Sequence, residues 1–368
     1  MSKKILIIFW GNPLYDGRCI NMVNQCLNEK HQLKVLGVGI KTERINYKGA
    51  TIQLINQNKL KNKYFKYFKY FKYVKQKIIT EKPNIVIASD LYSMIPIAQI
   101  KNNLSIKIIY DSREIYTQLA ALINKPMVQK MWAWYEKKYI KKVDVVLVTA
   151  EIDKQYLTAL YNHSKIVIIK NLPGDCFINN GQNDLKKILC LSDEQKIFLY
   201  QGKLHNGRGL RFAIKCISHI PNAVLVIIGD GPMKFQYLKN AKRYNIEDRI
   251  FFIDSVPYEQ LAAFSENAYI GLSLIQPISK SYEHALPNKL FEYAIRGLPI
   301  ICSDLPAMKD MILKHKVGIA IQWSNTDAFM KAYKEINQNY QNYILNKQNK
   351  MKLLWNTQNK HLINIINE

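Results

Sequence analysis

Residues 284–304 read HALPNKLFEYAIRGLPIICSD. Pro287 suits the first turn of a helix, and Gly297 suits the C-terminal cap of that helix. The apolar run LPIIC that follows predicts a buried strand. Within the helix, Lys289 and Glu292 stand three residues apart, so they share one face near its N-terminus. The stretch therefore predicts a helix that leads into a buried strand, which is the repeating unit of a parallel sheet.

In both directions from this stretch, short β-branched runs alternate with longer amphipathic stretches. The alternation is lost over residues 172–191, where proline, glycine and asparagine cluster. We therefore expect an α/β protein with two doubly wound, Rossmann-like domains, residues 1–171 and 192–336, joined by a linker over 172–191. Residues 337–368 predict a helix that packs across the domain junction, or a partly frayed tail. Ligands of doubly wound sheets bind where the strands end, so a cleft between the domains is the expected site.

Each expected strand is a short run rich in isoleucine, valine and leucine, as parallel strands buried on both faces are. In the first domain the expected strands are residues 4–9, 33–38, 85–88, 106–110, 143–149 and 165–169. In the second domain they are residues 197–200, 223–228, 250–253, 269–274, 298–302 and 317–321.

Composition narrows the class of protein. The chain has 368 residues, of which 48% are hydrophobic and 22% charged, so it can build two ordinary domains with their own cores. The formal net charge of +25 predicts an anionic partner: nucleic acid, an anionic membrane surface or a phosphorylated small molecule. The six cysteines are scattered and the N-terminal apolar run is short, so we expect a reduced, cytoplasmic, soluble or peripheral protein without a disulfide framework, zinc site or signal peptide.

Two glycine-rich loops each follow an expected strand. In YQGKLHNGRGL, residues 200–210, Gly202 and Gly209 permit tight turns, while Lys203 and Arg208 place positive charge beside the start of a helix. Free backbone N–H groups and fixed cations together suit a diphosphate, although a tight turn with solvated cations is the simpler alternative. In the second loop, GDGP, Gly229 and Gly231 would bring the backbone close to a ligand at the same sheet edge.

Lys289 and Glu292, in the helix between Pro287 and Gly297, also allow two interpretations. The Glu292 carboxylate is suited to accept hydrogen bonds from both hydroxyls of a ribose, and Lys289 is suited to meet a phosphate. An ion pair within the helix is the alternative.

Together these three stretches resemble the donor-binding half of retaining glycosyltransferases of family 4 (glycosyl transferases group 1), which have the two-domain GT-B architecture. That family typically shows G-x5-[KR]-G, G-x-G-P and P-x-K-x-x-E-x4-G-x-P-[VI], which here are residues 202–209, 229–232 and 287–300. YDSREIY (110–116) and WYEKKYIKKVDVVLVTA (134–150) resemble its acceptor-side stretches. The resemblance spans almost the whole chain.

The resemblance implies a hexosyltransferase-type glycosyltransferase that moves a sugar from a UDP- or GDP-sugar to a glycan or polyprenyl-phosphate-linked acceptor, with retention, in surface polysaccharide or glycoconjugate synthesis. Lys203 and Arg208 would stabilise the leaving diphosphate, and Glu292 would bind the ribose. The implied donor-binding set is Gly202, Gly209, Gly229, Gly231, Pro287, Asn288, Lys289 and Glu292. The implied acceptor-side set is Gly11, Asp111, Arg113 and Glu114.

Two positions depart from the family pattern. The earlier glutamate of its E-x7-E spacing is His284 here, and the histidine of its Y-D-x-H-E pattern is Arg113. No D-x-D pair is present to clamp a divalent metal, so we expect a metal-independent transferase with no cofactor, the nucleotide-sugar being a substrate. A non-catalytic basic protein on a nucleotide-binding scaffold, recruited to a membrane or nucleic acid, is the rival class.

The segment Lys59–Lys82 holds nine lysines and one glutamate, including the tandem YFKYFKYFKY. A surface helix with solvated lysines is one interpretation. Another is a contact with an anionic membrane surface, in which Phe65, Phe68, Phe71, Ile78 and Ile79 gather on one side of the helix and the lysines surround it. Nucleic acid ranks third and is not expected as a partner, so we expect a peripheral location on the inner face of the cell membrane.

Overall fold

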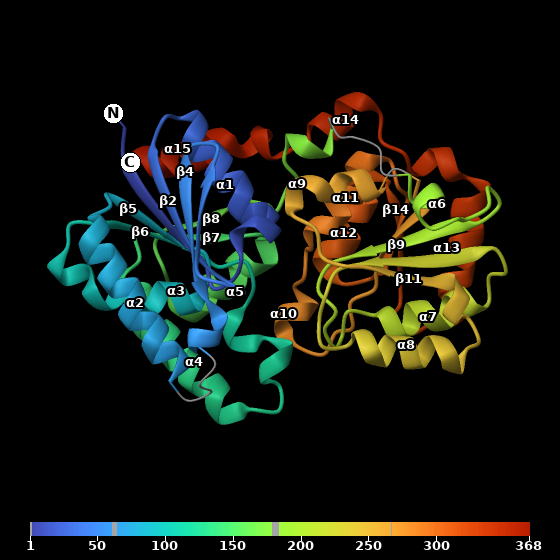
Figure 1. Ribbon diagram of the computed structural model, residues 1–368, viewed down its shortest axis with the longest axis horizontal. Coiled ribbons are helices and arrows are strands. Elements are labelled where there is room, and N and C mark those ends of the chain that lie inside the picture. The colour runs from blue at the N-terminus through green and yellow to red at the C-terminus, as the bar shows by residue number, and fades with distance from the viewer. Residues whose placement is uncertain (1, 61–64, 179–183, 266) are drawn as a thin grey trace. The chain divides into compact units, whose positions relative to one another are not determined.

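The computed structural model spans residues 1–368 and describes all of them except 1, 61–64, 179–183 and 266. The chain forms two compact units (Figure 1). The first comprises Met1–Lys170 and Gln358–Glu368, and the second comprises Asn171–Thr357. Each unit is built on one mainly parallel sheet covered by helices, which confirms the predicted α/β class with two Rossmann-like domains.

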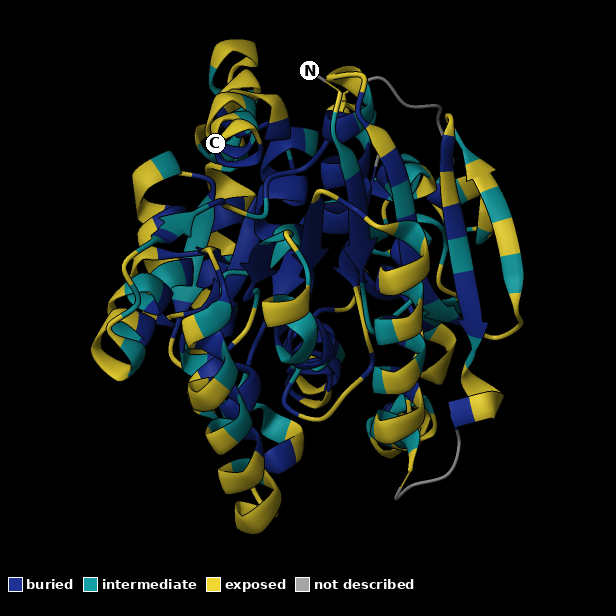
Figure 2. Cartoon of the chain, turned by 90° about the vertical axis from the view of Figure 1, so that its left-hand side faces the viewer, coloured by how far each residue is buried: buried dark blue, intermediate teal, exposed yellow. Residues whose placement is uncertain are grey.

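The first unit holds an eight-stranded sheet in the order β3-β4-β2-β1-β5-β6-β7-β8. Neighbouring strands are parallel except for β3 and β4, which are antiparallel. The strands are β1 (Lys4–Ile8), β2 (Gln32–Gly39), β3 (Glu43–Tyr47), β4 (Ala50–Asn56), β5 (Ile85–Ala88), β6 (Lys107–Asp111), β7 (Val145–Val148) and β8 (Ile166–Ile168). Figure 2 shows the central strands buried along most of their length, with exposed residues on the outer sides of the helices.

Helices cover this sheet and begin at side-chain caps where the sequence supplies them. Asp16 accepts a hydrogen bond from the Cys19 amide at the start of α1, and Asp90 accepts one from Ser93 at the start of α3. The α-helices are α1 (Gly17–Asn28), α2 (Lys66–Glu81), α3 (Leu91–Ile100), α4 (Pro126–Tyr139), α5 (Glu151–Tyr161) and α15 (Asn359–Asn367). The short 3-10 helices are η1 (Pro13–Tyr15), η2 (Gln57–Leu60), η3 (Lys101–Asn103), η4 (Tyr116–Gln118), η5 (Ala120–Leu122) and η6 (Ile140–Lys142).

The β3–β4 hairpin was not among the expected strands. Its two-residue turn, Lys48 and Gly49, has positive φ at both positions (50° and 96°), the geometry of a type I′ hairpin turn. Strand β3 lies at the edge of the sheet and is only partly buried, so its sequence lacks the continuous apolar run that marks the central strands.

The second unit holds a six-stranded, all-parallel sheet in the order β11-β10-β9-β12-β13-β14. Its strands are β9 (Lys196–Gln201), β10 (Ala223–Ile228), β11 (Ile250–Ile253), β12 (Ile270–Ser273), β13 (Ile300–Ser303) and β14 (Gly318–Ile321). The strand order reverses between β9 and β12, and in open parallel sheets such a reversal places a crevice at the carboxyl ends of the two strands.

Its α-helices are α6 (Leu185–Ile188), α7 (Leu210–Ser218), α8 (Lys234–Arg243), α9 (Tyr258–Leu261), α10 (Lys280–Glu283), α11 (Asn288–Arg296), α12 (Pro306–His315), α13 (Thr326–Gln338) and α14 (Lys347–Met351). The 3-10 helices are η7 (Asp175–Phe177), η8 (Glu247–Arg249), η9 (Ala262–Ser265), η10 (Tyr340–Tyr343) and η11 (Trp355–Gln358). Among the helices described here, none is long and apolar enough to cross a membrane.

The expected linker lies within the second unit, whereas the expected closing segment is divided between the two units. The described residues of 172–191 belong to the second unit, where Gly174 donates its N–H to the Tyr258 hydroxyl, while 179–183 lie outside the described residues. At the other end, the division between the units falls after Thr357, so residues 337–357 lie in the second unit and α15 in the first. Lys3 and Lys107 donate side-chain hydrogen bonds to the last carbonyls of α15.

Candidate functional site

The two glycine-rich loops meet at the carboxyl end of the second sheet. The first follows β9 and the second follows β10, its neighbour in the sheet. Gly202 donates its N–H to the Ile228 carbonyl at 2.9 Å, and Leu204 donates to the Asp230 carbonyl at 2.9 Å. The loops therefore support each other, and the first lies beside the switch point between β9 and β12.

Glycine is required at several loop positions because one backbone packs against another. A Cβ atom on Gly209 would lie 1.6 Å from the carbonyl oxygen of Leu274, and one on Gly229 would lie 2.1 Å from that of Gly202. At Gly231 it would lie 2.4 Å from a carbonyl of the first loop. A Cβ atom on Gly202 (φ 132°) would lie 3.4 Å from the ammonium of Lys289, a charged side chain of the site. Loop-to-loop packing therefore explains most of the glycine pattern.

Helix α11 has the predicted boundaries. Pro287 precedes its first residue, Asn288, and Gly297 caps its end with φ 76°, in the left-handed region. Both Pro287 and Asn288 are half-buried, whereas Lys289 and Glu292 in the following turn are buried.

No ion pair joins Lys289 to Glu292 in the described structure, so the simple alternative of a helix ion pair is not formed. The Lys289 ammonium instead lies over the ring of Tyr200, 3.6 Å from its centroid. The Glu292 carboxylate accepts a hydrogen bond from the side-chain amide of Gln201. Two oppositely charged groups thus stand in one buried region with separate partners.

Burial determines the electrostatics of this region. It raises the pKa of Glu292 to about 7, against the opposing effects of the Gln201 hydrogen bond and the Lys289 charge. Burial also lowers the pKa of Lys289 well below its usual value, and the positive charge of Arg208 lowers it further. Because the two cations repel each other, a bound anion would stabilise both, as the diphosphate of a nucleotide would.

The two cations expected from the first loop lie in different surroundings. Arg208 is half-buried, with its guanidinium 4.7 Å from the ring centroid of Tyr282, and it is close enough to Lys289 to shift its pKa. Lys203 is exposed, and its carbonyl accepts a hydrogen bond from the Tyr200 hydroxyl. His284 is buried at the end of α10.

Gln201 is a residue that the sequence analysis missed. It is the last residue of β9 and is buried; its side-chain N–H group binds Glu292, while its side-chain oxygen is buried without a hydrogen-bond partner in the described structure. Its backbone N–H donates to the hydroxyl of Tyr293, the residue after Glu292. A polar residue ending the apolar strand KIFLYQ, directly before the glycine loop, was the available signal.

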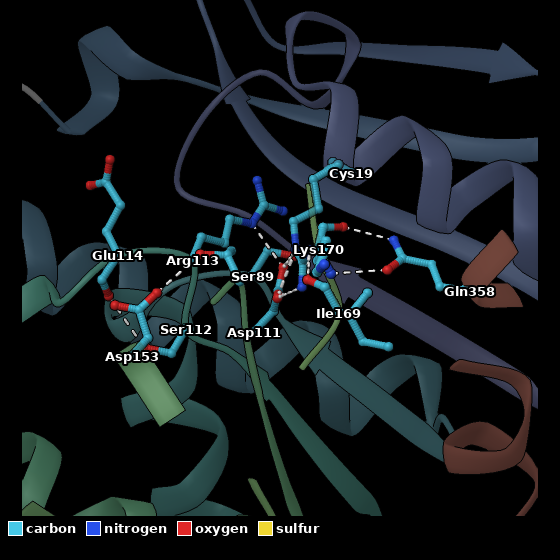
Figure 3. A network of polar contacts seen from close by, with 12 residues as sticks. Cys19, Ser89, Asp111, Ser112, Arg113, Glu114, Asp153, Ile169, Lys170 and Gln358 are labelled. Carbon is cyan, nitrogen blue, oxygen red and sulfur yellow. Dashed lines mark hydrogen bonds and ion pairs between the residues drawn. The ribbon is translucent and has the colours of Figure 1, made fainter. Parts of the chain in front are cut away.

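The expected acceptor-side residues lie in the first unit, two of them in a buried ionic network (Figure 3). Arg18 donates from Nε and Nη2 to Asp111, at 2.9 and 2.6 Å, and from Nη1 to the carbonyl of Ile169. Arg113 donates from Nε to the other oxygen of Asp111 at 2.8 Å and from Nη1 to Asp16 at 2.5 Å. Although burial alone would raise it, the pKa of Asp111 lies below its usual value because of the two arginines.

The four expected acceptor-side residues lie in different environments. Asp111 is fully buried and serves as the counter-ion of two arginines, so it is not placed to contact an acceptor. Arg113 lies over the ring of Phe9, and its Nη2 is buried without a hydrogen-bond partner among the described residues. Gly11 is half-buried, and the exposed Glu114 side chain is directed away from Asp111 (Figure 3).

The lysine-rich segment is only partly described, because residues 61–64 lie outside the described residues. Helix α2 buries Tyr70, Val74 and Ile78 against the sheet. Phe68 and Ile79 are exposed. The expected gathering of Phe65, Phe68, Phe71, Ile78 and Ile79 on one side is therefore wrong: Ile78 faces inward, because the buried positions follow a spacing of four residues and not the three-residue repeat of the sequence.

Among the described residues, no group of three or more histidine, cysteine, aspartate or glutamate side chains is arranged to hold a metal ion. The expected metal independence concerns activity and stays a prediction.

Comparisons with known proteins agree with this fold. Residues 181–352, a little under half of the chain, match the family described as Glycosyl transferases group 1. An uncharacterized glycosyltransferase of Methanocaldococcus jannaschii is 24% identical over 194 residues, covering 50% of this chain and 45% of the relative. The chitobiosyldiphosphodolichol beta-mannosyltransferase of Candida albicans is 23% identical over 223 residues, covering 56% and 47%. The alignments thus span about half the length of these curated relatives.

Solved structures show the fold over the whole chain. Sucrose-phosphate synthase from Thermosynechococcus elongatus superposes with a TM-score of 0.81 at 15% identity, covering 100% of this chain and 98% of its own. Anabaena HepE, solved with UDP and glucose, superposes with a TM-score of 0.75 at 10% identity and full coverage of both chains. The chain has the fold of GT-B glycosyltransferases.

Proposed function

We propose that the protein is a retaining GT-B glycosyltransferase of family 4 that transfers a hexosyl group from a UDP- or GDP-sugar to a glycan or polyprenyl-phosphate-linked acceptor. The observation that carries the proposal is the arrangement of the buried Lys289 and Glu292 with the half-buried Arg208 at the carboxyl end of the second sheet. It combines a carboxylate suited to ribose hydroxyls with two cations suited to a diphosphate.

The mechanism proposed is electrostatic. Negative charge grows on the diphosphate as the bond to the sugar breaks, and Arg208, Lys203 and the start of α11 stabilise that charge. Burial strengthens the effect at Lys289, because a desolvated ammonium gains more from an anion than one in water. Retention of configuration and a place in surface polysaccharide or glycoconjugate synthesis follow from the resemblance to family 4, and no nucleophile on the protein is assigned.

The relatives' names support a sugar-transfer activity. HepE was solved with UDP and glucose, and the Candida relative is named a mannosyltransferase acting on chitobiosyldiphosphodolichol. For this chain we propose a nucleotide-sugar donor and a lipid-linked or glycan acceptor held by the first unit. We further propose a peripheral location on the inner face of the cell membrane, supported by exposed side chains of α2 and of the residue before it: Phe65, Phe68, Lys69 and Lys72.

The deciding experiment is a two-stage screen of the full chain. Thermal melting with UDP, GDP and the corresponding nucleoside monophosphates identifies the base, and hydrolysis or transfer is then measured with sugars of that nucleotide. We expect stabilisation by one nucleoside diphosphate and turnover of its sugars. If neither diphosphate binds while the protein still binds anionic vesicles or nucleic acid, the chain is a non-catalytic basic binding protein.

A further inference from the structure

We propose that the outward face of α4 inserts into the interfacial layer of an anionic membrane. The proposal rests on the peripheral location proposed above, but it requires neither donor binding nor sugar transfer. The α4 face is defined by Ile123, Met127, Met131 and Trp134. The last three follow one another at intervals of four and three residues, so they form one stripe along the helix. All four side chains are exposed, Met127 by 84% and Trp134 by 56%.

The opposite side of α4 fixes the helix so that this stripe cannot turn inward. Trp132 is buried and packs edge-on against Tyr67 and Tyr92, with ring centroids 4.8 and 5.0 Å apart. Glu136 is also buried, and its carboxylate accepts hydrogen bonds from two tyrosine hydroxyls at 2.8 and 2.7 Å. Rotating α4 to bury the stripe would expose Trp132 and break the Glu136 hydrogen bonds, which costs more than leaving the stripe in water.

The side chains around the stripe are mostly positively charged, which favours an anionic partner. Residues 123–142 contain a single acidic side chain, Glu136, which faces the interior. The ammonium of Lys138 lies 4.7 Å from the ring centroid of Trp134, so the apolar surface and the positive charge are contiguous. Exposed apolar groups bordered by lysines are the pattern of helices that lie in the headgroup layer of anionic bilayers. The lysines of this segment are Lys125, Lys130, Lys137, Lys138, Lys141 and Lys142.

Helix α2 extends the surface. The contact between Tyr67 and Trp132 places the beginning of α2 beside α4, and Phe65 and Phe68 are exposed there. Figure 1 shows α2, α3 and α4 together on the first unit. The two helices, the turn before α4 and Phe65, directly before α2, hold eight of the seventeen large apolar side chains that are exposed among the described residues. Such a concentration of apolar surface indicates a binding function.

Two other occupants fit less well. A second copy of the chain would bring two lysine-rich surfaces together, and like charges in an interface oppose association. Nucleic acid would leave the aliphatic side chains of Met127, Met131 and Ile123 without a matching partner, because bases bind best by stacking on aromatic rings. A bilayer matches both the apolar stripe and the positive border.

The test compares two double variants of the full chain. Met127→Gln/Trp134→Gln removes half of the α4 face. Phe235→Gln/Leu313→Gln is the matched control from the second unit, where Phe235 and Leu313 are exposed by 68% and 65% and Lys239 lies 4.8 Å from the Phe235 ring centroid. Co-sedimentation is measured with vesicles of phosphatidylglycerol and phosphatidylcholine in equal parts, and with pure phosphatidylcholine, without nucleotide.

We expect wild-type protein to bind the anionic vesicles, the α4 double variant to bind at least about tenfold more weakly, and the control to differ by less than about twofold. Replacing Lys130, Lys137 and Lys141 by Gln should also weaken binding by about tenfold or more, and the loss should be smaller in high salt. Melting temperatures verify that each variant is folded.

Trp134 supplies a second readout, because Trp132 and Trp355 are buried and Trp10 and Trp323 are half-buried. Brominated lipids should quench part of the wild-type fluorescence but almost none of that of Trp134→Phe. Equal quenching in both proteins, or vesicle binding that falls only in the lysine variant, would show electrostatic adsorption without insertion and would overturn the proposal. A dimer that the α4 double variant abolishes would instead assign the face to a second copy, and RNA binding lost in that variant would assign it to nucleic acid.

Vesicle binding through α4 with no affinity for nucleoside diphosphates would refute the proposed function alone. Nucleotide binding without vesicle binding would refute only this inference.

Discussion

Replacing Glu292 by Gln should make the second unit more stable at high pH while it abolishes tight nucleotide binding. Folding raises the pKa of Glu292 from an ordinary 4.5 to about 7, because the carboxyl is buried. The folded protein therefore holds this proton more tightly than the unfolded chain. Stability from this group is fully present below about pH 4.5 and is lost as the pH rises through 7.

The size of the effect follows from the shift. The two pKa values differ by about 2.5 units, and at about 1.4 kcal/mol per unit the ionised carboxylate costs the folded state on the order of 3 kcal/mol above pH 7. The neutral Gln side chain retains the size of Glu and the contact to Gln201, so it avoids most of this cost. For a unit of this size, 3 kcal/mol corresponds to roughly 6–12 °C in melting temperature.

Binding should change in the opposite direction. The ionised carboxylate would accept charge-assisted hydrogen bonds from the ribose, so Glu292→Gln or Glu292→Ala should weaken binding of the correct nucleoside diphosphate at pH 8 by about 2–4 kcal/mol. That is roughly 30- to 700-fold in Kd. In the wild type, affinity should fall as the pH drops below 7, because the carboxyl becomes protonated.

Thermal or urea unfolding at pH 8.5 and pH 5.5, with calorimetry at both, measures these changes. Glu283→Gln is the matched control, because Glu283 is a half-exposed residue paired with Lys280 on a nearby helix. If Glu292→Gln lowers stability equally at both pH values, Glu292 is a structural partner and the argument from its burial fails. Unchanged affinity in a folded variant would remove Glu292 from the proposed nucleotide site.

Three further outcomes are expected. Lys203→Ala and Arg208→Ala should each lower turnover more than nucleotide affinity in steady-state kinetics, because the leaving-group charge grows in the transition state. In the same assay, EDTA should leave the wild-type rate largely intact. A strict requirement for magnesium or manganese would contradict the expected metal independence. Gln201→Leu should move the midpoint of pH-dependent nucleotide binding upward, because the hydrogen bond from Gln201 lowers the pKa of Glu292, and an unmoved midpoint would refute that role. Replacing four lysines of the segment Lys59–Lys82 by Gln should reduce co-sedimentation with anionic vesicles and activity on lipid acceptors while sparing donor hydrolysis, and undiminished vesicle binding would reduce the segment to a solvated helix; the four are Lys66, Lys69, Lys72 and Lys75.

The sequence by itself determined the local framework of both units and the positions of the two glycine-rich loops. Parallel strands buried on both faces leave continuous apolar runs, and the turn from β9 into α7, like the cap of α11, needs glycine for its backbone geometry. These signals are local, so Pro287, Gly297 and the strands around them could be read without a structure. The edge strand β3 was not predicted, because a partly buried strand has no continuous apolar run.

Only the tertiary structure decided which polar groups meet. Gln201 and Glu292 are 91 residues apart and Arg18 and Asp111 are 93 apart, so no spacing in the sequence indicates that they bind each other. The same holds for α4: its sequence contains both Trp132 and Trp134, and the packing of Trp132 on Tyr67 and Tyr92 leaves Trp134 at the surface. A side chain's role depends on which neighbours exclude water from it, and those neighbours come from distant parts of the chain.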